Sequence, residues 1–125
     1  MNITITVKTE TKTHTFTVRL SQCKPALAFA EFLRSGDCTV KMHDDGSCWS
    51  GTLAASLFGS DVQESSEPKG ICLELDELCL EEPFVLSDGT KAANWTLIGK
   101  LQGVAQDKVR AIIGSGDVTA IFSVK

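Results

Sequence analysis

The chain has few of the residues that usually carry out catalysis or bind metals. Its 125 residues include two histidines, no tyrosine, and no two cysteines with the two-residue spacing of many zinc and redox sites. There is also no glycine-rich phosphate loop and no pair of carboxylates in a recognisable acid–base setting. We therefore expect no metal, no cofactor, and a binding protein rather than an enzyme.

Signals for export and for membrane insertion are also missing. The residues Met1 to Thr4 lack a basic side chain of the kind that opens a secretory signal, and no apolar run nears the roughly 20 residues that cross a bilayer. The five cysteines are an odd number, which favours reduced thiols over a disulfide framework. With 42% hydrophobic residues and a net charge of −4, disorder is not expected. These features predict one cytoplasmic domain over residues 1–125 that does not bind membranes.

The spacing of apolar residues predicts both strands and helices. Residues 3–7 and 13–20 alternate apolar with polar side chains, as in an antiparallel hairpin. Pro25 begins a helix in which Ala26, Phe29, Ala30 and Leu33 form one apolar stripe. The other expected elements are strands at 38–42, 71–75, 84–86 and 118–124, helices at 53–58, 94–101 and 107–113, a turn at 44–46 and a loop at 61–70. This order predicts an α+β fold: an antiparallel sheet that opens with a β-hairpin, short helices packed on one face, and a C-terminal helical hairpin followed by a strand.

Acidic residues are concentrated in one segment. Seven of them lie between Glu64 and Glu82, against the single cation Lys69. Such a surface repels nucleic acid and membranes and attracts basic protein surfaces. The candidate protein-binding residues are Glu74, Asp76, Glu77, Glu81 and Glu82. Our leading hypothesis is a small acidic protein that binds and modulates or inhibits another protein with a basic surface, as accessory factors of phages, plasmids or bacteria do.

A second hypothesis, DNA binding, comes from residues 94–120. Asn94 can cap a helix that turns Trp95, Ile98 and Leu101 inward, Gly103 can end it, and a second helix would follow. This segment resembles the helix–turn–helix of excisionase and MerR-type proteins. The resemblance implies that Gln106, Lys108 and Arg110 face the major groove of DNA. It also suggests a subdivision into an acidic part, 1–87, with a net charge of −6, and a helix–turn–helix-like part, 88–125, with a net charge of +2.

A third hypothesis, thiol hydrolysis, comes from the sequence Gly46-Ser47-Cys48-Trp49. It resembles the nucleophile segment of papain-like cysteine proteases, in which a cysteine begins a helix and an imidazole lowers its pKa. The resemblance implies Cys48 as the nucleophile. The histidines that could pair with it are His43 and His14, and both precede it in the chain.

Overall fold

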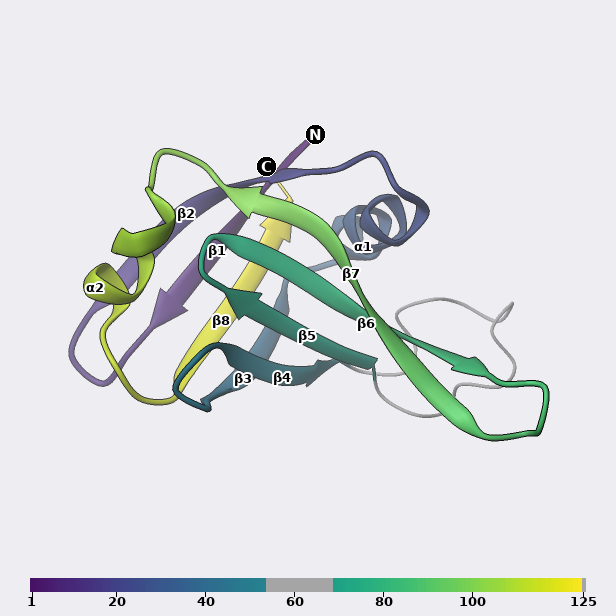
Figure 1. Ribbon diagram of the computed structural model, residues 1–125. Helices are drawn as coiled ribbons and strands as arrows, with labels where there is room; N and C mark the ends of the chain where they lie inside the picture. Colours follow the sequence, from purple (N-terminus) through teal and green to yellow (C-terminus); the bar gives the residue numbers. More distant parts are fainter. Residues whose placement is uncertain (54–68, 125) are drawn as a thin grey trace.

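The computed structural model shows a closed barrel of eight antiparallel strands (Figure 1). It describes residues 1–53 and 69–124. The strands are β1 (Asn2–Lys8), β2 (Thr13–Leu20), β3 (Cys38–Asp44), β4 (Trp49–Leu53), β5 (Lys69–Glu74), β6 (Glu77–Val85), β7 (Lys91–Leu101) and β8 (Val118–Val124). The helical elements are α1 (Lys24–Arg34), the 3-10 turn η2 (Gln106–Lys108) and α2 (Val109–Ile113). Neither described helix is long and apolar enough to cross a membrane.

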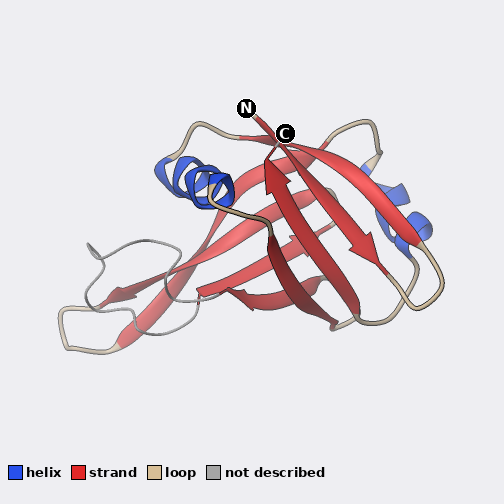
Figure 2. Cartoon of the chain, turned by 180° about the vertical axis from the view of Figure 1, so that it is seen from behind, coloured by secondary structure: helices blue, strands red, loops and turns tan. Residues whose placement is uncertain are grey.

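Two long connections close the barrel. Its strand order is β1-β2-β7-β6-β5-β4-β3-β8, so β8 lies between β1 and β3. The segment containing α1 leads from β2 past β1 and β8 to β3, and the segment containing η2 and α2 leads from β7 back to β8. The other strands follow one another in space as they do in sequence. Figure 2 shows α1 and α2 on opposite sides of the barrel.

The interior is filled by the inward-facing residues of every strand and by one face of α1. Ile3, Ile5 and Trp49 are almost completely buried. The buried residues of α1 are Ala26, Phe29, Ala30 and Leu33. The ring of Phe29 meets Phe122 of β8 edge to face, with ring centroids 5.4 Å apart. The helix packs against β7 and β8 and contributes its apolar stripe to the same core.

Several of the expected elements are confirmed. The opening hairpin pairs Asn2–Lys8 with Thr13–Leu20, and α1 has Pro25 in its first turn. Strands are present at 38–44, 69–74 and 118–124, and a short helix follows η2. The expected helix at 53–58 and the loop at 61–70 fall largely outside the described residues; Leu53 ends β4, and residues 69–70 begin β5.

The predicted α+β fold is wrong, because the sheet closes on itself and residues 94–101 belong to β7 rather than to a helix. A β-bulge explains the misleading pattern. The register shifts between Leu78 and Cys79 of β6, so that β7 carries one extra residue there. Ile98, Gly99 and Leu101 are therefore all buried, and the three-residue step from Ile98 to Leu101 imitates the spacing of a helix.

Candidate functional site

Three adjacent strands present a continuous outer surface with unusual composition. On β6 the outward residues are Glu77, Cys79 and Glu81. Their cross-strand neighbours on β7 are Lys100, Leu97 and Trp95, in that order. On β5, Glu74 is opposite Glu77, and Cys72 is opposite Cys79. We call this surface, together with the connecting turn at Leu75 and Asp76, the β5–β7 face.

Trp95 is the most prominent side chain of this face. It is 49% exposed, and Leu97, two residues along the same strand, is 39% exposed. A Cβ added to Gly70 on β5 would lie only 2.8 Å from Cη2 of Trp95 and 3.0 Å from Oε2 of Glu81. The indole ring therefore reaches over β6 as far as β5, and Gly70 leaves room for it. A large aromatic side chain held across the outside of a barrel is typical of a binding hot spot rather than of a core position.

The turn between β5 and β6 is strained and exposed. Leu75 has a φ of +54°, the only positive φ among the described non-glycine residues, and its side chain is 51% exposed. A left-handed conformation costs an ordinary L-residue about 1 kcal/mol or more, and glycine or asparagine would be the usual choice. Strain of this kind is often retained at functional sites. The fold therefore displays a leucine at a position where it lowers stability.

Carboxylates surround this leucine. Glu74 and Glu77 are directly opposite each other across the turn, an arrangement of like charges that destabilises a hairpin. Lys100 is opposite Glu77 on its other side. Glu81 is farther along β6 beside Trp95, and Asp76 holds the turn through its carbonyl, which accepts a 2.8 Å hydrogen bond from the N–H of Leu101. Four of the five predicted acidic residues thus lie on one face, whereas the side chain of Glu82 is outside what the structure describes.

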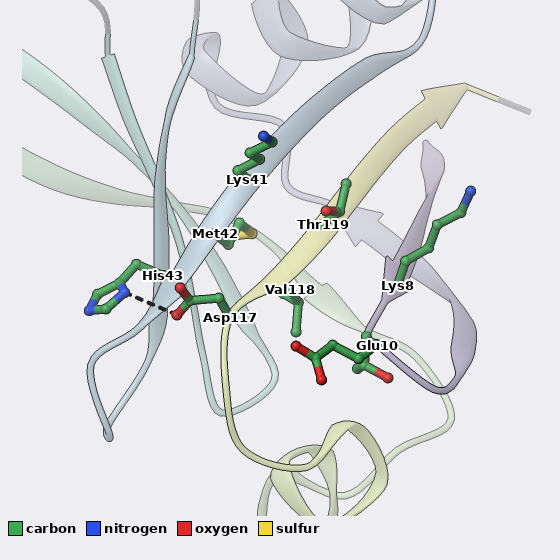
Figure 3. A pocket seen from close by; sticks show the side chains of 9 residues that line it. Lys8, Glu10, Lys41, Met42, His43, Asp117, Val118 and Thr119 are labelled. Atoms are coloured by element: carbon green, nitrogen blue, oxygen red, sulfur yellow. Dashed lines mark ion pairs between the residues drawn. The ribbon is translucent and has the colours of Figure 1, made fainter.

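Apart from the β5–β7 face, the barrel has a groove across β1, β8 and β3 with a volume of about 390 Å³ (Figure 3). His43 donates from Nδ1 to Oδ1 of Asp117 at 3.0 Å. Figure 3 shows that the ammonium groups of Lys8 and Lys41 point away from the carboxylates of Asp117 and Glu10. The charges of the lining are mixed and do not converge on one point. We therefore assign no ligand to this groove.

Asp44 connects three separate segments beside this groove. Its Oδ2 accepts hydrogen bonds from Nη1 of Arg110 at 3.0 Å and from the N–H of Gly116 at 2.7 Å, and its Oδ1 accepts one from the N–H of Gly46 at 2.9 Å. These bonds, led by the one from Arg110, lower the pKa of Asp44 to about 2. The guanidinium of Arg110 also lies 4.0 Å from the centroid of the Trp49 ring, whose Nε1 donates to the carbonyl of Gly116. This cluster joins β3, β4, α2 and the loop that leads into β8, and its role is structural.

The Asp44 cluster predicts a specific loss of acid stability. Because the pKa of Asp44 is lower in the folded chain than its ordinary value of 3.8, its ionised form stabilises the fold above about pH 4, and this contribution is lost as the pH falls to about 2. We expect Asp44→Asn to lower the melting temperature by several degrees at pH 7. This difference from the unsubstituted protein should shrink between pH 4 and pH 2.

Thermal melts followed by circular dichroism measure this effect. The control is Asp107→Asn, since the side chain of Asp107 is exposed and makes no hydrogen bond or ion pair with any part of the chain that the structure describes. The control should melt with the unsubstituted protein at every pH. A constant gap for Asp44→Asn down to pH 2 would contradict the assigned pKa.

The structure does not bring the three predicted catalytic residues together. Cys48 lies in the turn before a strand rather than at the start of a helix, and its Sγ donates to Oδ2 of Asp45 at 3.3 Å. Burial, followed by the Asp45 carboxylate, raises the pKa of the Cys48 thiol, whereas nucleophilic cysteines need a lowered pKa. His43 is paired with Asp117, and His14 lies in β2, which β1 and β8 separate from β3. The thiol-hydrolase hypothesis stays a prediction, and the local charges do not favour it.

The predicted helix–turn–helix is wrong as a structure. Its first helix is strand β7, and its second is the short pair η2 and α2. Gln106 and Lys108 are exposed on η2, but the guanidinium of Arg110 is used in the Asp44 cluster. A Cβ at Gly99 would lie 2.9 Å from the carbonyl oxygen of Arg19, so this glycine allows strand β2 to approach β7 closely.

Comparisons with known proteins give no further information about the β5–β7 face. Among the described residues, no group of three or more histidine, cysteine or acidic side chains could hold a metal ion. The chain matches no protein-family model, no curated protein and no solved structure.

Proposed function

We propose that the protein binds another protein through the β5–β7 face and modulates it. The observation that carries this proposal is Trp95, a half-exposed tryptophan that is held across the outer wall of the barrel, with Leu97 beside it. Tryptophan is enriched at the centres of protein interfaces, where its burial contributes much of the binding energy. Leu75, at the strained turn between β5 and β6, is a further exposed apolar side chain on the same face.

The charges of the face define the chemistry of the partner. Glu74, Glu77 and Glu81 border the apolar residues. Lys100 is opposite Glu77, and the exposed Arg19 of β2 is opposite Lys100 at the edge of the face. A partner that presents lysine or arginine around an apolar pocket would relieve the repulsion between Glu74 and Glu77. Nucleic acid and anionic membranes would be repelled. We therefore propose that the partner is a protein with a basic surface. We also propose that the two proteins bind each other in the cytoplasm and that this chain performs no catalysis.

The proposal is tested by capture with variants. The tagged full-length protein is used to recover proteins from nuclease-treated lysate of the cells that produce it, and each recovered protein is quantified. We expect Trp95→Ala, and separately the double variant Glu74→Lys, Glu77→Lys, to lower recovery of the partner at least tenfold. Recovery by the unsubstituted protein should also fall as the salt concentration rises from about 50 mM to about 0.5 M, because exposed charges are screened.

Matched control variants distinguish binding through the β5–β7 face from nonspecific adsorption. Ile112→Ala removes a similarly exposed apolar side chain on α2, and Asp107→Lys reverses an acidic charge on η2. Both should recover the partner as the unsubstituted protein does. Leu75→Asn should weaken recovery without lowering the melting temperature, because asparagine tolerates a positive φ. Equal recovery by all variants would overturn the proposal. So would a partner that is recovered from untreated lysate but not from nuclease-treated lysate.

A further inference from the structure

A pair of thiols lies in the middle row of the β5–β7 face. Cys72 of β5 and Cys79 of β6 are directly opposite each other in the antiparallel register, and both point outward. Residues directly opposite in such a pair have Cα atoms about 4.5 to 5.5 Å apart. Disulfides form at Cα separations of roughly 4.4 to 6.8 Å. The backbone therefore already holds these two cysteines at a separation that a disulfide bond accepts.

We propose that Cys72 and Cys79 are a modification site at which small-molecule disulfides convert the two thiols into a cross-strand disulfide. The proposal does not depend on the proposed function. All five cysteines of the chain are free in the structure. Cys23 lies before α1, and Cys38 is opposite Phe122 of β8. The thiol of Cys48 donates a hydrogen bond to Asp45. Cys72 and Cys79 are the only two that the described strand register places face to face.

The reaction has two balanced steps. Cys79 is half-buried, whereas Cys72 is a buried residue with 8% exposure, so Cys79 reacts first. It loses its proton to solvent, attacks one sulfur of the small disulfide and displaces one small thiolate, which leaves a mixed disulfide on Cys79. Cys72 then loses its proton and attacks the Cys79 sulfur, which displaces the second small thiolate. Two protein thiols are oxidised and one small disulfide is reduced to two thiols.

The surroundings of Cys72 and Cys79 slow the oxidation of the two thiols and favour the disulfide over the reduced form once it has formed. Burial, and then the neighbouring Cys79, raises the pKa of Cys72 to about 12, and burial raises the pKa of Cys79. The thiolate is the attacking species, so a raised pKa slows oxidation at neutral pH. The same raised pKa means that the reduced form gains no stabilisation as a thiolate, unlike the reduced form of strongly oxidising dithiols. We expect the rate of oxidation to rise about tenfold for each pH unit between pH 7 and pH 9.

The test uses the folded full-length protein and excess oxidised glutathione. After incubation, free thiols are blocked with N-ethylmaleimide, and the protein is cleaved after glutamate for mass spectrometry. Cleavage after Glu74, Glu77 and Glu81 separates Cys72 from Cys79, so their disulfide appears as two peptides that are joined by one bond and separate on reduction. We expect this linked pair, three maleimide groups on the other cysteines, and a melting temperature several degrees above that of the reduced protein.

Variants that each replace one cysteine test whether the reaction follows these two steps. Cys72→Ser should stop at a glutathione adduct on Cys79, because the second thiol is missing. Cys48→Ser should form the Cys72–Cys79 bond as the unsubstituted protein does. Linkage of a different pair would overturn the proposal. So would a folded protein that remains fully reduced at pH 9 under conditions in which the urea-unfolded chain is oxidised.

Discussion

Replacing Phe29 by alanine is expected to lower the free energy of unfolding by about 3 to 5 kcal/mol. The side chain is fully buried, and its ring meets Phe122 edge to face. It is the largest of the residues by which α1 fills the core. Truncation removes apolar contacts and leaves a cavity between the helix and β8, and rigid strands on the other side of the core limit how far it can collapse.

Urea denaturation followed by circular dichroism measures this change. The control is Leu27→Ala, on the same helix but 48% exposed, which should change the free energy of unfolding by no more than about 0.5 kcal/mol. Equal effects of the two substitutions would mean that α1 is not anchored in the core through Phe29.

Gly51→Ala is the second substitution with a large expected effect, a loss of about 3 kcal/mol. A Cβ at this position would lie 2.5 Å from Cγ1 of Val40 and 2.8 Å from the carbonyl oxygen of Lys41. The carbonyl belongs to the backbone of β3 and cannot turn away as the end of a flexible side chain could. The absence of a side chain at Gly51 therefore lets β4 cross close over β3.

The neighbouring substitution Thr52→Ala serves as the control for Gly51→Ala. Thr52 is exposed and lies in the same strand, so its loss should cost less than about 1 kcal/mol through β-propensity alone. If Gly51→Ala is as stable as the unsubstituted protein in the same urea titration, then β3 and β4 do not approach as closely as described.

Local patterns in the sequence were sufficient for the elements that depend on local contacts. The alternation at 3–7 and 13–20 and the polar link between them predict the β1–β2 hairpin, and Pro25 with the apolar stripe predicts α1. Closure of the barrel depends on pairings between strands that are distant in the chain. Strand β8 pairs with both β1 and β3, and β2 pairs with β7. A half-buried strand shows the same alternation in an open sheet as in a barrel, so these pairings leave no local signature.

The candidate face was predicted only in part. The acidic residues could be read from composition, and four of them do lie together on the β5–β7 face. The apolar members were missed because a helical interpretation of residues 94–101 turned Trp95 inward together with Ile98 and Leu101. The bulge in β7 creates that spacing, while Trp95 is on the opposite, exposed side of the strand. The positive φ of Leu75 also had no signal in the sequence, since leucine is not a residue that usually adopts it.

The central claim, that the β5–β7 face contacts a protein partner, is tested most directly by photo-crosslinking in living cells. A photoreactive amino acid is placed at Leu97, and in a matched protein at Ile112, because the two side chains are 39% and 40% exposed but lie on different elements. We predict that irradiation links one discrete protein to position 97 and that this product is absent from position 112. A product formed from position 112 and not from position 97 would contradict the assignment of this face.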